Sequence, residues 1–79
     1  MKVPRDVYAI DLINLLKHYG YSIIRQTGSH IRLSKVLHER EHSITVPNRK
    51  PIKIGTLQSI VNDVCSVNNL DINNFYQRL

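Results

Sequence analysis

The chain has 79 residues, of which 42% are hydrophobic, and it carries a formal net charge of +5. That length is enough for one domain over residues 1–79, which buries only about 60–65% of its unfolded surface, and it is too short for two domains. The longest apolar runs fall far short of the roughly 18 residues of a membrane span, and acidic residues without a small-residue cleavage site argue against an N-terminal signal peptide.

A first helix is expected over residues 6–19. One face at the helical period of 3.6 residues is formed by Leu12, Leu15, Leu16 and Tyr19. Asp6 can accept hydrogen bonds from the first free N–H groups as the N-cap. Gly20 can take the left-handed conformation that follows the last turn.

Three short strands are expected next, over residues 21–26, 30–37 and 42–47. Thr27–Gly28 forms the first turn and the charged stretch 38–41 forms the second. Because side chains alternate along a strand, the pattern predicts one apolar and one polar face. The inward side chains are Ile31, Leu33, Ile44 and Val46, and the outward ones are His30, Arg32, Ser34, Ser43 and Thr45.

Residues 48–55 form a basic loop, and a second helix begins at residues 55–56 and ends in the asparagine-rich stretch 67–69. Its buried face consists of Leu57, Ile60, Val61 and Val64. Asp71 then caps a short helix over residues 72–79. This order predicts an α+β fold in which helices cover one face of a three-stranded antiparallel sheet and the other face is solvated.

The net charge is concentrated in the middle of the chain. Residues 20–55 hold seven Lys and Arg against two Glu, which is 7 − 2 = +5, and the remaining residues sum to zero. A basic surface of this kind favours a polyanionic partner, and nucleic acid is the first candidate.

The residues that could bind a metal or form a disulfide are few: His18, His30, His38, His42 and Cys65. No two of them have the spacing of metal ligands on one helix, so no metal cofactor is expected. A single cysteine cannot form an intramolecular disulfide, which fits a cytoplasmic protein. All the histidines except His30 are expected to be ordinary solvent-exposed side chains.

His30 differs because it begins a strand on the solvated face, directly after Gly28 and Ser29. Imidazole, with an ordinary pKa of about 6.5, can take up and release a proton near neutrality. It therefore suits the attack of an RNA 2′-hydroxyl on the neighbouring phosphate. Ser29 is not expected to form a nucleophile–base pair with His30, because adjacent strand residues point to opposite faces.

The basic loop offers a second candidate site. Arg49, Lys50 and Lys53 directly precede Gly55–Thr56, where the second helix begins. A helix N-terminus has unpaired N–H groups and a positive partial charge, and both attract phosphate. These residues predict an anion-binding site.

Several short motifs in a fixed order resemble those of one family. They are Gly20-Tyr21, Arg25-Gln26, Gly28-Ser29-His30, Ile44-Thr45-Val46-Pro47 and Gly55-Thr56-Leu57 with Ile60. Each motif alone is weak, but the ordered set, between Leu12 and Phe75, resembles the HicA-type (YcfA-like) toxins. These are small messenger-RNA interferases of toxin–antitoxin modules. The resemblance implies a fold similar to the double-stranded-RNA-binding domain.

The resemblance further implies metal-independent cleavage of messenger RNA, with His30 as the catalytic histidine of the Gly-Ser-His motif. It implies a HicB-type antitoxin as partner, and leaves open a homodimer or a hetero-oligomer with the antitoxin. The residues expected to contact RNA are Arg25, Gly28, Ser29, Arg32, Lys35, Asn48, Arg49, Lys50, Lys53 and Thr56. Asn48 and Gln58 stand where the family often has histidine and arginine, and Asn48 cannot carry a proton.

Two alternatives stay open. A non-catalytic module of the same fold would bind double-stranded RNA through its shape and 2′-hydroxyls. A DNA-binding subunit would place residues 56–66 in a major groove. The polar residues there are Gln58, Asn62 and Asp63, and no arginine is available to read bases.

Overall fold

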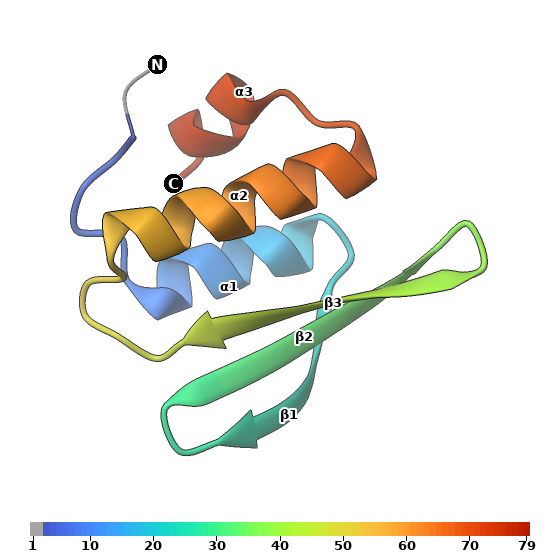
Figure 1. Cartoon of the computed structure of the whole chain (residues 1–79), viewed down its shortest axis with the longest axis horizontal. Helices are drawn as coiled ribbons and strands as arrows, with labels where there is room; N and C mark the ends of the chain where they lie inside the picture. Colours follow the sequence, from blue (N-terminus) through green and yellow to red (C-terminus); the bar gives the residue numbers. More distant parts are fainter. Residues whose placement is uncertain (1–2) are drawn as a thin grey trace.

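A computed structural model describes residues 3–79 (Figure 1). The elements are α1 (Ala9–His18), β1 (Ser22–Thr27), β2 (His30–Leu37), β3 (Arg40–Pro47), α2 (Ile54–Asn68) and α3 (Ile72–Gln77). The strands form one antiparallel sheet in the order β1-β2-β3, and the helices lie on one side of it (Figure 1). The expected α+β architecture is confirmed.

The helices and the sheet enclose one hydrophobic core. The sheet contributes Ile31, Leu33, Ile44 and Val46, and the helices contribute residues that include Leu12, Leu16, Leu57, Val61, Val64 and Phe75. The inward faces expected from the strand and helix periods are therefore the buried ones. Full burial of such a side chain contributes roughly 1.5–3 kcal/mol, so this layer holds the sheet against the helices. No helix formed by residues 3–79 lies over the opposite face of the sheet (Figure 1).

The start of α1 differs from the expectation. The helix begins at Ala9 rather than at residue 6, and Asp6 is not its N-cap. Val7 is buried, and its carbonyl accepts a hydrogen bond from the Ile52 N–H at 2.8 Å, so this segment follows the core instead of the helix. The carboxylate of Asp11, in the first turn of the helix, accepts a hydrogen bond from the Tyr8 N–H at 3.1 Å. A residue within the helix thus satisfies the free N–H of the N-cap.

The other helix ends are closer to expectation. Gly20 has a φ of +98°, and the N–H groups of Gly20 and Tyr21 donate to the carbonyls of Lys17 and Leu16, both at 3.0 Å, which closes α1 as a Schellman motif. Asp71 caps α3 by accepting from the Asn74 N–H at 3.2 Å. α2 begins at Ile54 without a side-chain cap, and its N-cap is Lys53.

Both hairpin turns contain two residues, Gly28–Ser29 and His38–Glu39. The first turn is shifted by one residue from the expected Thr27–Gly28. The second is shorter than the expected stretch 38–41, because His38 and Glu39 both adopt positive φ values, 52° and 65°. Two such residues match the twist of the flanking strands and close a tight hairpin. β3 consequently begins at Arg40 and pairs with β2 along its whole length.

A β-bulge interrupts β1. Ile23 pairs with Leu33, but Arg25 pairs with Arg32, so Ile24 is an extra residue on the β1 side. Regular alternation would place Arg25 on the same side of the sheet as Ile23. The extra residue moves Arg25 to the other side, the open face.

Candidate functional site

His30 is the first residue of β2, and its neighbours across the sheet are Thr27 on β1 and Pro47 on β3. It is solvent-exposed on the open face. Its Nδ1 lies 3.3 Å from the Ser29 hydroxyl. Within residues 3–79, its Nε2 forms no hydrogen bond or ion pair. One ring nitrogen is therefore oriented and the other is available to a ligand.

The contact between Ser29 and His30 corrects an expectation. Ser29 lies in the turn and not on the strand, so strand alternation does not direct its side chain away from His30. No carboxylate in the described part of the chain contacts His30. Without an acidic group behind the imidazole, the pair lacks the third member of a nucleophilic triad. The hydroxyl can still orient the ring.

The basic loop is attached at both ends. The Asn48 N–H donates to the Ser29 carbonyl at 2.7 Å, next to His30. Beyond it, the Arg49 carbonyl accepts from the Ala9 N–H at 3.3 Å, and Ile52 is buried. These bonds hold the first residues of the loop beside the Gly28–Ser29 turn.

Two arginines face each other across β1 and β2. Arg25 and Arg32 are directly opposite in the register, and both are exposed. Arg32 Nη1 donates to the Thr45 hydroxyl at 3.1 Å. Among residues 3–79, no Asp or Glu forms an ion pair with either guanidinium. Strand alternation puts His30 on the same face as Arg32.

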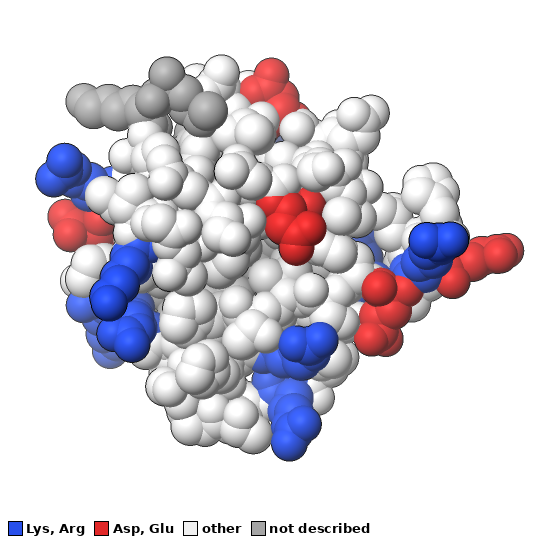
Figure 2. Space-filling view, in the orientation of Figure 1, with Lys and Arg blue, Asp and Glu red and all other residues white. Residues whose placement is uncertain are grey.

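The basic side chains are unevenly distributed over the surface of the molecule. Figure 2 shows basic side chains around the loop that precedes α2 and over β1, whereas the surface over α2 is mostly uncharged. The α2 sequence contains no Lys or Arg. The basic surface is therefore on the sheet and loop side of the molecule and not on the outer face of α2.

The structure brings most of the predicted site residues together and separates a few. The residues on the open face, in the adjoining turn or in the attached loop are Arg25, Gly28, Ser29, His30, Arg32, Asn48, Arg49 and Lys50. Lys53 and Thr56 lie further along, at the start of α2, where Thr56 is within the first turn. Lys35 is on the opposite face, where its Nζ donates to Asn68 at 2.6 Å. Thr45 also belongs to this face, through its contact with Arg32, and no sequence motif singles it out.

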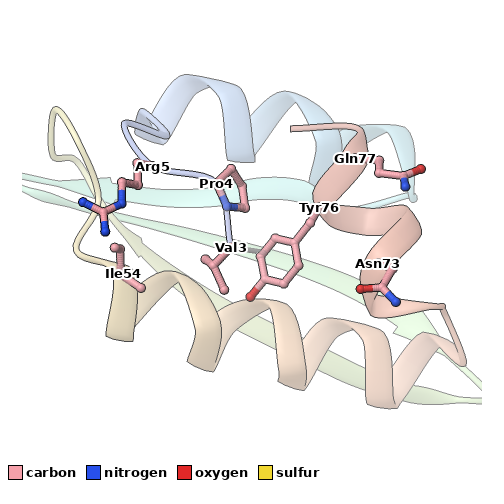
Figure 3. A pocket seen from close by; sticks show the side chains of 7 residues that line it. All are labelled: Val3, Pro4, Arg5, Ile54, Asn73, Tyr76 and Gln77. Atoms are coloured by element: carbon pink, nitrogen blue, oxygen red, sulfur yellow. The ribbon is translucent and has the colours of Figure 1, made fainter. Parts of the chain in front are cut away.

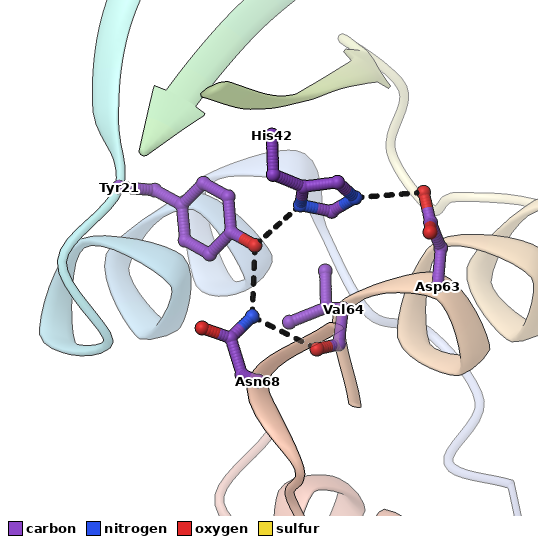
Figure 4. A network of polar contacts seen from close by, with 5 residues as sticks. All are labelled: Tyr21, His42, Asp63, Val64 and Asn68. Atoms are coloured by element: carbon purple, nitrogen blue, oxygen red, sulfur yellow. Dashed lines mark hydrogen bonds and ion pairs between the residues drawn. The ribbon is translucent and has the colours of Figure 1, made fainter. Parts of the chain in front are cut away.

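His42 is the histidine whose environment was wrongly predicted. It is half-buried, with Nδ1 2.6 Å from the Tyr21 hydroxyl (Figure 4). Its Nε2 lies 3.2 Å from Asp63, an ion-pair distance without hydrogen-bond alignment. The Asn68 amide donates to Tyr21 Oη at 2.9 Å and to the Val64 carbonyl. Burial, more than the neighbouring Asp63 charge, raises the pKa of Tyr21, although the Asn68 hydrogen bond opposes this. The cluster joins the sheet to α2.

A cavity of about 900 Å³ lies elsewhere, between the N-terminal segment, the start of α2 and α3 (Figure 3). It is lined mainly by Val3, Pro4, Ile54 and Tyr76, with Arg5 at its edge (Figure 3). None of the predicted site residues lines it. In residues 3–79, no three His, Cys, Asp or Glu side chains are placed to bind a metal together, and no described helix has the length and hydropathy to cross a membrane.

An exposed histidine beside a basic open face, on a sheet backed by helices, defines a surface suited to a polyanion. The family model described as HicA toxin of bacterial toxin–antitoxin matches residues 10–64. No curated protein and no solved structure is significantly similar to the chain. The matched segment is more than half of the chain and includes the whole sheet, so the chain belongs to the HicA toxin family. A toxin of such a system has an antitoxin as its partner, and toxins of this family are generally ribonucleases.

Proposed function

We propose that this toxin is an endoribonuclease that cleaves messenger RNA and blocks translation, with His30 as its acid–base group. RNA would lie across the open face of the sheet and the adjoining basic loop. A HicB-type antitoxin would cover the same surface and prevent access. The site of action would be the cytoplasm, where messenger RNA is translated.

In the proposed reaction, His30 Nε2 accepts the proton of an RNA 2′-hydroxyl. The 2′-oxygen attacks the adjacent phosphorus, and the bond from phosphorus to the 5′-oxygen of the next nucleotide breaks. The leaving 5′-oxygen takes a proton from water or from the protonated His30. The products carry a 2′,3′-cyclic phosphate and a 5′-hydroxyl, and an imidazole can perform both proton transfers.

The cations have a separate task. Negative charge develops on the phosphate oxygens as the 2′-oxygen attacks, and preorganised positive groups stabilise it. Arg32 is two residues from His30 on the same face. Arg49 and Lys50 extend the basic surface along the RNA backbone, where each phosphate contact adds sequence-independent affinity. Lys35 has no such role here, because it contacts Asn68 on the other face.

The observation that carries this proposal is the position of His30. Its Nε2 is unpartnered within the described residues and exposed on a face with two arginines that no carboxylate neutralises. Asn48 favours a second candidate, a non-catalytic RNA-binding module. It occupies the place where many family members have a histidine, and its amide cannot transfer a proton.

The two candidates differ in one product. Purified protein is incubated with single-stranded RNA in the presence of a chelator, and the fragments are analysed for a 2′,3′-cyclic phosphate end. The ribonuclease proposal expects such fragments from the wild type and none from His30→Ala. RNA binding by the wild type without fragments would support the binding module instead.

A further inference from the structure

The pairing of Arg25 with Arg32 is unfavourable in the free protein. Residues directly opposite on antiparallel strands have Cβ atoms only about 4.5–5.5 Å apart, and like charges at such positions destabilise a sheet. Neither guanidinium has an acidic partner among residues 3–79. An anion between the two would convert this repulsion into two attractions.

We propose that Arg25 and Arg32 together bind a single phosphate, the scissile phosphate of the RNA, and that Thr45 is a positioning residue for Arg32. This rests on the proposed function for the identity of the ligand. The planar guanidinium matches two phosphate oxygens at once, so two opposed guanidiniums can enclose one phosphate.

Thr45 restricts one of the two side chains. Its hydroxyl accepts from Arg32 Nη1 at 3.1 Å across the β2–β3 pair. A guanidinium has five N–H donors, so one bond to Thr45 leaves others free for a ligand. Fixing the side chain beforehand lowers the entropy that is lost when a phosphate binds.

The bulge at Ile24 places the other arginine. If β1 paired regularly, with Ile24 opposite Arg32, Arg25 would lie on the same side of the sheet as Ile23, the helix side. Bulges occur next to active sites, where they redirect a side chain. The irregularity of β1 thus creates the arginine pair on the open face.

The distance along β2 connects this pair to His30. Two residues of strand separate the Cα atoms of His30 and Arg32 by about 6.6–6.8 Å, and both side chains leave the same face. A 2′-hydroxyl near His30 Nε2 therefore has its own 3′-phosphate within reach of the arginines.

The test measures binding alone. A short single-stranded RNA that carries 2′-O-methyl groups cannot undergo 2′-hydroxyl attack, so it binds without being cleaved. Its affinity is measured over a range of salt for the wild type, Arg25→Gln, Arg32→Gln and the double variant. Arg40→Gln is the matched control, because Arg40 is an exposed arginine opposite Leu37 in the distal hairpin.

Arg25→Gln and Arg32→Gln should each weaken binding about ten-fold or more. Each should also make the slope of log affinity against log salt shallower by about 0.7. The double variant should lose less than the two single losses combined, since both residues contact one phosphate. Thr45→Val should weaken binding in the wild type but not in Arg32→Gln. The proposal is overturned if Arg25→Gln behaves like Arg40→Gln, or if the two losses are fully additive.

Thermal unfolding supplies a second readout, which distinguishes phosphate binding by Arg25 from a purely structural role of this residue. Arg25→Gln should be at least as stable as the wild type, because the repulsion is removed. Inorganic phosphate should raise the melting temperature of the wild type more than that of Arg25→Gln, and an equal rise would contradict the site. Neither measurement depends on catalysis, so absence of RNA cleavage by the wild type would reject the proposed function and leave this result standing.

Discussion

The hydroxyl of Ser29 lies 3.3 Å from Nδ1 of His30. This contact gives the two ring nitrogens different environments, because Nδ1 has a protein partner and Nε2 has none among residues 3–79. If Nδ1–H donates to the hydroxyl, Nε2 is the unprotonated nitrogen that can accept a proton. The Ser29 backbone is itself held by the Asn48 N–H at 2.7 Å. The turn thereby fixes the position of the serine that contacts Nδ1, and the tautomer with Nδ1–H is the one that leaves Nε2 free to accept a proton.

We expect Ser29→Ala to lower the cleavage rate by a few-fold, since a neutral hydrogen bond contributes about 0.5–1.5 kcal/mol. Ser29→Thr keeps the hydroxyl and should retain most of the rate. Nitrogen-15 chemical shifts of the His30 ring report the tautomer directly. An unchanged tautomer ratio in Ser29→Ala would show that the serine does not orient the ring.

His30→Ala should reduce RNA cleavage by about 10²–10⁴-fold, the usual contribution of a positioned acid–base group. His30 is exposed and contributes no core contact, so the free energy of unfolding should change by no more than about 0.5 kcal/mol. His38→Asn is the matched control, because His38 is also exposed and asparagine tolerates its positive φ of 52°. Equal cleavage by His30→Ala and His38→Asn would reject the catalytic role.

Tyr21→Phe should lower the free energy of unfolding by about 1–3 kcal/mol, because it leaves the half-buried His42 Nδ1 without its partner and removes one of the hydrogen bonds of the Asn68 amide. Its effect on RNA cleavage should be small, since this cluster is on the helix side of the sheet. Tyr8→Phe is the control, as Tyr8 is 44% exposed. Urea denaturation at neutral pH measures the free energy of unfolding of both variants. If Tyr21→Phe lost more cleavage activity than folded protein, the cluster of Tyr21, His42 and Asn68 would have a role in cleavage beyond stability.

The same tyrosine predicts a dependence of stability on alkaline pH. Burial raises the pKa of Tyr21 above its ordinary value of 10.0, so the folded state holds this proton more tightly than the unfolded state. The resulting stability is complete below pH 10 and is lost as pH rises through the folded pKa. Tyr21→Phe should therefore lose less stability across this range than the wild type does. Part of the loss should remain, because burial also raises the pKa of Tyr76 and Cys65.

The buried faces and the order of elements were predictable, because they follow from periodicity. Ile31 and Leu33 alternate as the inward side chains of a strand do, and Leu57 and Val64 have the spacing of one helix face. In each case only one face of the element carries enough apolar side chains to be buried, and that face is the buried one. His30 was placed on the open face by the same alternation. These predictions needed only the local pattern of the sequence.

The register and the bulge could not be predicted, because local signals were absent or misleading. A turn over residues 38–41 would pair Leu37 with His42, whereas the observed turn pairs it with Arg40. That tight turn requires positive φ at two residues, and neither His38 nor Glu39 is glycine. The contact between Arg32 and Thr45 depends on this register, so Thr45 was missed as a site residue.

Gly20 and Gly55 should respond in opposite directions to alanine. Gly20 has a φ of +98°, and a Cβ there would lie 3.3 Å from Lys35 Cε. Gly20→Ala should therefore destabilise the fold by about 1–2 kcal/mol. Gly55 is helical with no atom within 4 Å of an added Cβ, so Gly55→Ala should stabilise by up to about 1 kcal/mol. Thermal unfolding of the two variants checks both signs. Destabilisation by both substitutions would mean that the start of α2 requires a glycine for a reason other than helix geometry.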